Sequence, residues 1–399
     1  MGKTNRITAE MFGLIVALFL VIQPITAAHA QQPGGTSAKN VMEQQADTIG
    51  VEDISVFWDR LIDEYGGFLP ESQKGSLLDF IKGEKKFSLS AWFTGILKFL
   101  FYELTANGKL LGTLIMLTVF SVLLQSMQNA FEKFSISKVA YAIVYMVLIV
   151  LALNSFHVAA TYAEEAINTM IHFILGLLPL LLALMAASGG FVSASFFHPI
   201  IIFIVNTSGL VVQYFVLPLL FLSALLSIVS TLTENYKVTQ LADLLKKVSV
   251  GSLGVLLTIF LGVISVQGAS TAITDGITVR TARFVTGNFV PIIGRLFTEA
   301  TDTVLSASVL LKNTVGIAGA AVLLGIALFP AIKVLSLALI YKLAAAMLQP
   351  LGGGPVIDCL DVISKSVIYV FAALLMVSFM FFLAITIVIA ASNIMFMFR

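Results

Sequence analysis

Few residues in this chain have the types and spacing that catalysis needs. The sequence contains no phosphate-binding loop, no paired-histidine zinc motif, no hydrolase nucleophile turn and no closely spaced cysteine pair. Its one cysteine, Cys359, cannot form an internal disulfide, and its four histidines lie too far apart to indicate a metal cluster. We therefore expect no enzyme, no cofactor and no metal site. Transport through the chain would need an ion gradient, a partner ATPase or passive flow.

Lys333 is the strongest candidate for a charge within the membrane. It follows Pro330 in an apolar stretch, and Asp358 or Asp361 is its expected partner. Ionisable residues inside membrane helices commonly mark a transport pathway. The alternative is that Lys333 and Lys342 lie near the membrane surface, with their ammonium groups reaching the headgroups.

A second candidate is the long, moderately polar segment 268–313, which lies between predicted spans. Its first part places the carboxylate of Asp275 near two guanidinium groups, and its second part reads as an amphipathic helix with an i,i+4 ion pair. We interpret it as a partner-docking or pore-mouth segment, with an ordinary helix on the bilayer surface as the alternative. Basic residues in the loops do not decide its sidedness. The candidate residues are Asp275, Arg280, Arg283, Pro291, Gly294, Arg295 and Glu299.

The composition indicates a membrane protein. Of 399 residues, 58% are hydrophobic and 11% charged, with a mean hydropathy of +1.00, whereas about a quarter of the residues in a soluble domain are charged. Fifteen charged residues fall within 43–86, and only twenty-six within 87–399. The 23 basic and 22 acidic residues leave almost no net charge to attract nucleic acid. The sequence therefore predicts an all-α, polytopic helical membrane protein with one small polar module near its start.

Residues 1–30 are predicted to be a cleaved signal peptide. Lys3 and Arg6 precede the apolar run Met11–Ile22, and small residues follow as far as Ala30. The run is short for crossing about 30 Å of hydrocarbon, although an uncleaved anchor is the alternative. Cleavage would place the mature N-terminus outside the cytoplasm.

Residues 31–108 are predicted to form a small extracytoplasmic module. One helix ends at Gly66-Gly67, a short apolar set follows at 77–81, and an aromatic-rich interfacial helix occupies 87–104. Two short helices cannot bury a large core alone, so we expect packing against a partner or the membrane surface, with a solvated hairpin as the alternative. The apolar residues at helical spacing in the first helix are Ile54, Phe57, Trp58, Leu61, Ile62 and Tyr65.

Residues 109–399 are predicted to form a transmembrane domain with about seven spans. The stretch Ile200–Leu232 is too long for one simple crossing and indicates a kink, a broken helix or a hairpin. Thr314–Leu348 is a second long stretch, interrupted at Pro330. Glu164 and Glu165 fall between spans and are interpreted as a solvated loop. The clearer spans are Leu110–Met127, Val139–His157, Met170–Ala187, Val250–Val266 and Val367–Ala390.

The central segment, 265–316, carries a family resemblance. Its distinctive residues are Ser265-Val266-Gln267-Gly268, Asp275, the Arg280–Arg283 stretch, Asn288-Phe289-Val290-Pro291, Gly294 and Lys312-Asn313. In these residues the chain resembles the stage III sporulation protein AE family of endospore-forming bacteria. Residues 348–352 and 357–366, the length and the span layout are also similar, so the likeness covers essentially the whole chain.

The resemblance implies a role in sporulation within the mother-cell membrane that surrounds the engulfed forespore. It also implies partners: the other stage III A proteins, including a cytoplasmic ATPase and ring-forming proteins, and stage II sporulation protein Q on the forespore side. Together these would form a channel, or feeding tube, that supports late forespore gene expression.

Two functions of different classes remain at this point. The first is a membrane platform or conduit subunit of that channel, in contact with membrane lipid and open to homo-oligomer formation. The alternative is a stand-alone secondary transporter of small solutes. Few intramembrane charges and no visible repeat symmetry favour the first.

Overall fold

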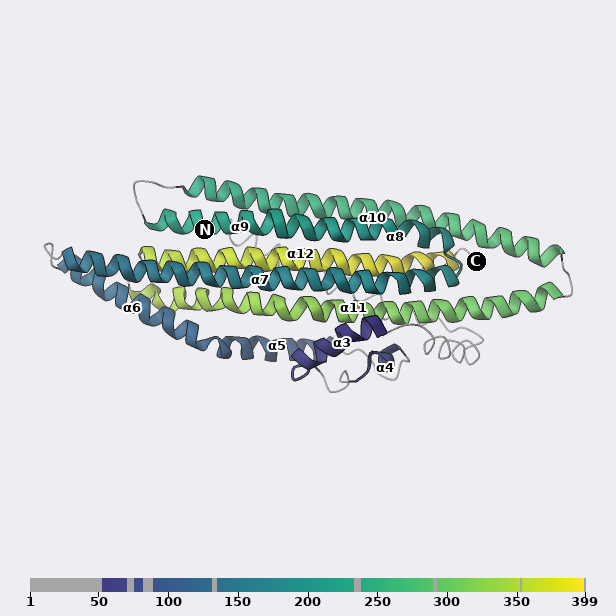
Figure 1. Ribbon diagram of the computed structural model, residues 1–399, viewed down its shortest axis with the longest axis horizontal. Helices are drawn as coiled ribbons and strands as arrows, with labels where there is room; N and C mark the ends of the chain where they lie inside the picture. Colours follow the sequence, from purple (N-terminus) through teal and green to yellow (C-terminus); the bar gives the residue numbers. More distant parts are fainter. Residues whose placement is uncertain are drawn as a thin grey trace.

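The computed structural model describes residues 52–69, 75–81, 89–130, 135–232, 238–289, 293–351 and 354–397. Within these ranges the chain forms helices and turns and no strand. The long helices lie side by side along one axis and make an elongated bundle (Figure 1). The predicted signal peptide lies outside the described residues. The bundle helices are α6 (Gly108–Ala130), α7 (Ser135–Ala187), α8 (Phe191–Val211), α9 (Leu217–Leu232), α10 (Thr239–Phe289), α11 (Ile293–Leu348) and α12 (Pro355–Met397).

In the described part of the chain, six helical stretches are long and apolar enough to cross a membrane. The predicted class, a polytopic all-α membrane protein, is confirmed, and six is close to the expected seven. Several stretches exceed the roughly 20 residues that a bilayer requires: α7 has 53 residues and α11 has 56, or about 80 Å each. The six are Gly108–Met127, Val139–Ala187, Phe191–Thr231, Thr239–Val266, Leu305–Leu348 and Pro355–Ala390.

Helix α7 joins two segments that the sequence predicts as separate spans, Val139–His157 and Met170–Ala187. The intervening residues, including Glu164 and Glu165, continue the helix, so the interpretation as a solvated loop was wrong. Alanine and glutamate are strong helix formers, and this connection contains neither glycine nor proline to stop the helix. Both glutamates are exposed on the helix surface.

The stretch Ile200–Leu232 is continuous as well. Helix α8 passes into a π-helical turn, Val212–Val216, and then into α9 without a hairpin. Gln213 in this turn donates a hydrogen bond from Nε2 to Oδ1 of Asn168 on α7, over 2.8 Å. Pro330 likewise lies inside α11 without ending it. Both long apolar stretches are thus helical throughout, one with a π-helical turn and the other with an internal proline.

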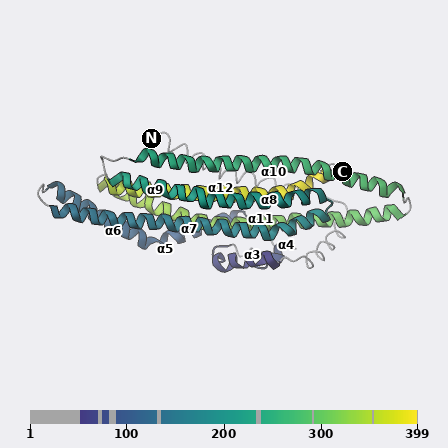
Figure 2. The same ribbon diagram turned by 45° about the horizontal axis from the view of Figure 1, so that its top comes forward.

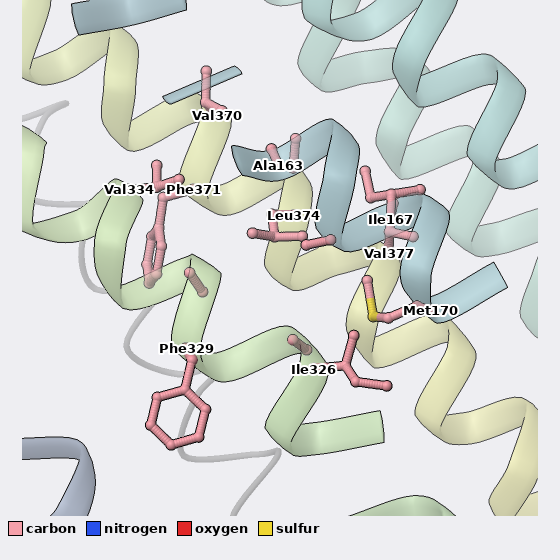
Figure 3. Packing of buried hydrophobic residues seen from close by; sticks show 14 of the residues in the cluster. Ala163, Ile167, Met170, Ile326, Phe329, Val334, Val370, Phe371, Leu374 and Val377 are labelled. Carbon is pink, nitrogen blue, oxygen red and sulfur yellow. The ribbon is translucent and has the colours of Figure 1, made fainter. Parts of the chain in front are cut away.

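The centre of the bundle is an apolar core shared by α7, α11 and α12. In Figure 3, Ala163 and Ile167 come from α7, and Leu374 and Val377 from α12. Phe329 of α11 points away from α12 in the same view. Inside a bilayer, close packing of such side chains is a main force that holds helices together, because lipid tails are as apolar as the side chains.

The predicted N-terminal module packs against the flank of the bundle (Figures 1 and 2). It contains α3 (Glu52–Tyr65), α4 (Leu77–Ile81) and α5 (Leu89–Ala106). Helix α3 ends just before Gly66-Gly67, as predicted, and its apolar face is buried. This face lies on α11 and α7 of the same chain. The surface that the sequence left for a partner or the membrane is therefore covered by the bundle itself.

Candidate functional site

Lys333 lies where α3 meets α7 and α11. Its Nζ is 3.0 Å from Oε1 of Glu64 on α3. The same Nζ lies 5.1 Å from the ring centre of Tyr65 and 5.6 Å from that of Tyr162 on α7. The negative face of an aromatic ring attracts a nearby cation. The ammonium group is thus held by one carboxylate and flanked by two rings.

A glycine on α11 allows α3 to approach closely. A Cβ at Gly325 would lie only 2.5 Å from Cδ1 of Leu61. One turn further along α11, the ring of Phe329 stacks on Tyr65 with centroids 4.1 Å apart, and Phe99 of α5 meets both rings edge-on. These contacts fix the end of α3 on α11. They thereby place Glu64, the neighbour of Tyr65, beside Lys333.

A pocket of about 150 Å³ opens at this junction, between α3, α7 and α11. Its walls carry charges of both signs: Arg60 and Lys333 are cationic, and Glu64 and Glu165 are anionic. Apolar and hydroxyl-bearing side chains make up the rest. The mixture is unsuited to a metal ion, and no group of His, Cys, Asp and Glu within the described ranges has the arrangement for one.

The carboxyl group of Glu64 is ionised at neutral pH. Burial raises its pKa, but hydrogen bonds from Tyr65 and Lys333 and the positive charge of Lys333 together lower the pKa below its ordinary value. The Tyr65 hydroxyl donates to Glu64 Oε1 over 2.5 Å, and burial and this carboxylate raise the pKa of the tyrosine. Burial also raises the pKa of Glu103 on α5. The junction therefore holds a charged carboxylate against a charged lysine.

The prediction that Asp358 or Asp361 pairs with Lys333 was wrong, because Lys333 pairs with Glu64. Asp361 on α12 pairs instead with Lys342 and Lys365, each at 2.5 Å. Lys333 is 28 positions before Asp361 along two antiparallel helices, whereas Lys342 is nearer the connection between them and so faces Asp361. Glu64 reaches Lys333 from 269 residues earlier in the sequence. No local spacing rule connects two such positions.

The other candidate residues lie at the far ends of α10 and α11. Asp275, Arg280 and Arg283 belong to α10, and Gly294, Arg295 and Glu299 belong to α11. Pro291 lies outside the described residues, and the structure does not describe the side chains of the other six. Their role as a docking or pore-mouth segment stays a prediction.

Lys312 is a buried lysine that sequence reasoning missed. Its side chain is fully buried (0% exposed), and its Nζ donates a hydrogen bond to the backbone carbonyl of Ile389 on α12, over 2.8 Å. Within the described residues it has no ion-pair partner. The available signal was a single lysine between apolar residues at the start of a span. That pattern also fits a lysine at the membrane surface.

Comparison with known proteins identifies the family. The family model for stage III sporulation protein AE matches residues 72–392. Stage III sporulation protein AE of Bacillus subtilis (strain 168) is 64% identical over 379 residues, which cover 95% of each chain. No solved structure matches. The family match and the six candidate spans together describe a multi-pass membrane protein with a role in sporulation. The chain belongs to the stage III sporulation protein AE family.

Proposed function

We propose that this chain is a membrane platform subunit of the channel between mother cell and forespore, where it supports late forespore gene expression. It would lie in the mother-cell membrane with its mature N-terminus outside the cytoplasm. Its partners would be the other stage III A proteins, including a cytoplasmic ATPase and ring-forming proteins, and stage II sporulation protein Q. Membership of the stage III sporulation protein AE family supports this placement.

The structural observation that carries the platform role is the filled centre of the bundle. Helices α7, α11 and α12 bury apolar side chains against one another along the bundle. Among the described residues, the pocket that Ile174, Leu177 and Ile385 line in this core has a volume of only about 10 Å³, room for one water molecule at most. A solute passage would need a wider and more polar route. We therefore propose that any conduit forms between chains, with this subunit as part of its wall or support.

The segment 268–313 is the proposed partner-docking part of the subunit. Its residues 268–304 lie between the α10 span, which ends at Val266, and the α11 span, which begins at Leu305, so this part projects from the end of the bundle (Figure 1). It carries Asp275, Arg280 and Arg283, which suit a partner with complementary charge. The module 31–108 would instead pack against the bundle of its own chain and stabilise it.

Replacement of the Bacillus subtilis relative tests the proposed function. A strain that lacks its own stage III sporulation protein AE is complemented with this chain or with an empty vector, and is followed by microscopy and a late forespore reporter. We expect the empty-vector strain to complete engulfment and then to show a shrinking forespore and a silent reporter, and the complemented strain to recover. Normal spores in the empty-vector strain, together with a defect in solute uptake, would instead support the alternative function as a secondary transporter.

A charge reversal tests the docking segment. Arg280→Glu combined with Arg283→Glu should reduce co-purification with the ATPase and the ring proteins while the protein stays in the membrane. Lys247→Glu, an exposed lysine near the other end of α10, is the matched control. Wild-type assembly and sporulation in the double variant would remove the segment as a docking site.

A further inference from the structure

The pocket beside Lys333 combines unused charges of opposite sign. Lys333 and Glu64 neutralise each other, and the Tyr65 hydroxyl also binds Glu64. Two more charged residues line the same pocket: Arg60 from α3 and Glu165 from α7. Both are exposed, and in the described part of the chain neither makes an ion pair. One guanidinium and one carboxylate thus border a shared space without bonding to each other.

The two groups come from different elements. Arg60 belongs to the module and Glu165 to the bundle, so the pocket exists only while α3 is docked. Arg60 lies near enough to Glu64 for its positive charge to lower the pKa of that carboxyl. With Lys333 and Glu64 paired, the positive charge of Arg60 lies on the α3 side of the pocket. The uncompensated negative charge of Glu165 lies on the α7 side.

The size and the walls of the pocket limit what can enter. Its volume is about 150 Å³, small beside the roughly 300 Å³ or more of a pocket for a drug-sized ligand. Phe57, Leu61, Ile326 and Pro330 supply apolar surface, and Thr169 and Tyr162 supply hydroxyl groups. The space suits a short molecule with charged ends and a small apolar middle.

We propose that this pocket binds a small zwitterion. Its ammonium group would lie against Glu165, and its carboxylate or phosphate against Arg60. Free α-amino acids have this chemistry, and so does the phosphoethanolamine headgroup of a lipid. A bound zwitterion bridges α3 and α7 and so stabilises the docked module. This site is independent of the proposed channel role.

The chain carries its own reporter for this binding. Its two tryptophans, Trp58 on α3 and Trp92 on α5, both lie in the module and are buried. Tryptophan fluorescence of the purified full-length protein in detergent therefore follows undocking of the module on heating. Ligands that bind the docked form raise the midpoint of that transition in a saturable way.

The binding test compares four probes at millimolar concentration: glycine, O-phosphoethanolamine, acetate and methylammonium. We expect at least one zwitterion to raise the midpoint, and the singly charged probes to leave it unchanged. Glycine acting alone indicates a free amino acid, and phosphoethanolamine acting alone indicates a lipid headgroup. No saturable shift with either zwitterion, or an equal shift with acetate or methylammonium, would overturn the proposal.

Variants locate the site. Glu165→Gln and Arg60→Gln should each weaken binding by about tenfold or more, because each removes a hydrogen bond to a charged group. Glu164→Gln and Asp63→Asn are matched controls, since each is an exposed neighbour that does not line the pocket. Arg60→Lys keeps the positive charge, so it should bind the zwitterion with most of the wild-type affinity. It thereby separates loss of the charge from a disturbance of α3 in Arg60→Gln. Equal losses in Glu164→Gln and Glu165→Gln would contradict the assignment.

Discussion

Two of the three lysines of helix α11, Lys312 and Lys333, lie 21 positions apart in very different surroundings. Lys333 lies at an open junction, where Glu64 and two tyrosine rings surround its ammonium group. Lys312 is fully buried against α12 and reaches only a backbone carbonyl. One lysine thus attaches a peripheral helix to the bundle, whereas the other lies between two core helices. A lysine in an apolar helix is therefore tolerated either through a partner from a distant segment or through the backbone alone.

The largest expected effect concerns Lys312. Lys312→Glu places a buried negative charge beside a carbonyl oxygen, and we expect it to cost about 3–5 kcal/mol and to prevent stable folding. Lys312→Met has similar volume and no charge, and we expect it to be neutral or stabilising. Helical circular dichroism during heating in detergent measures both. A strong loss with methionine would mean that the ammonium group itself is needed there.

The next effect concerns the glycines that accompany each lysine. A Cβ at Gly316 would lie 2.4 Å from Cγ1 of Ile389, and a Cβ at Gly325 would meet the flexible end of Leu61. We expect Gly316→Ala to destabilise the bundle by about 1–3 kcal/mol, and Gly325→Ala to cost less. Circular dichroism during heating measures the stability of Gly316→Ala, and tryptophan fluorescence measures the docking of α3 in Gly325→Ala.

Gly254→Ala on α10 is the control, because nothing lies within 4 Å of its added Cβ. It should stabilise the helix by up to about 1 kcal/mol through its better helix propensity. If Gly316→Ala behaved like Gly254→Ala, α11 and α12 would not be in close contact there.

A smaller effect is expected at the Lys333–Glu64 pair. Glu64 keeps 51% of its side chain exposed, so solvent screens the interaction, and we expect a coupling energy of about 1 kcal/mol or less. Lys333→Met, Glu64→Gln and the double variant form the mutant cycle, measured by tryptophan fluorescence. Additive changes would show that the apolar contacts of Leu61 and Tyr65 alone hold α3 in place.

The smallest effect is the pH dependence of the same pair. The pKa of Glu64 in the folded protein lies below its ordinary value of 4.5, so its contribution is present above that value and is lost as the pH falls below it. We expect the fluorescence midpoint to fall in that acid range. Glu103, whose pKa is raised, acts in the opposite direction. Glu64→Gln should abolish the fall, and an unchanged fall in that variant would assign it to another carboxyl group.

The sequence predicts the local features of this molecule well. Apolar spacing and Gly66-Gly67 define α3 to its last residue, and hydropathy identifies the membrane helices. Connections are harder to predict, because Glu164 and Glu165 are compatible with either a loop or a helix. They belong to α7 because the surrounding sequence is rich in alanine and because α7 packs against other helices of the bundle.

Contacts between distant segments could not be predicted from the sequence. Nothing near Lys333 in the chain indicates Glu64, and nothing near Gly325 indicates Leu61. Periodicity identifies which face of a helix is apolar but not which other helix covers it. The pocket depends on three such pairings at once, so none of its geometry was predictable.

The π-helical turn at Val212–Val216 has a consequence for how one helix serves different neighbours. An α-helix rotates about 100° per residue, and a π turn holds one extra residue, so the faces before and after it are offset by about that angle. Helix α8 can therefore direct one stripe at α7 while α9 directs a different stripe at α12. Deleting a single residue in this turn would therefore rotate α9 by about 100° relative to α8. Every side chain of α9 would then face away from its present neighbours, while α8 would keep its contacts.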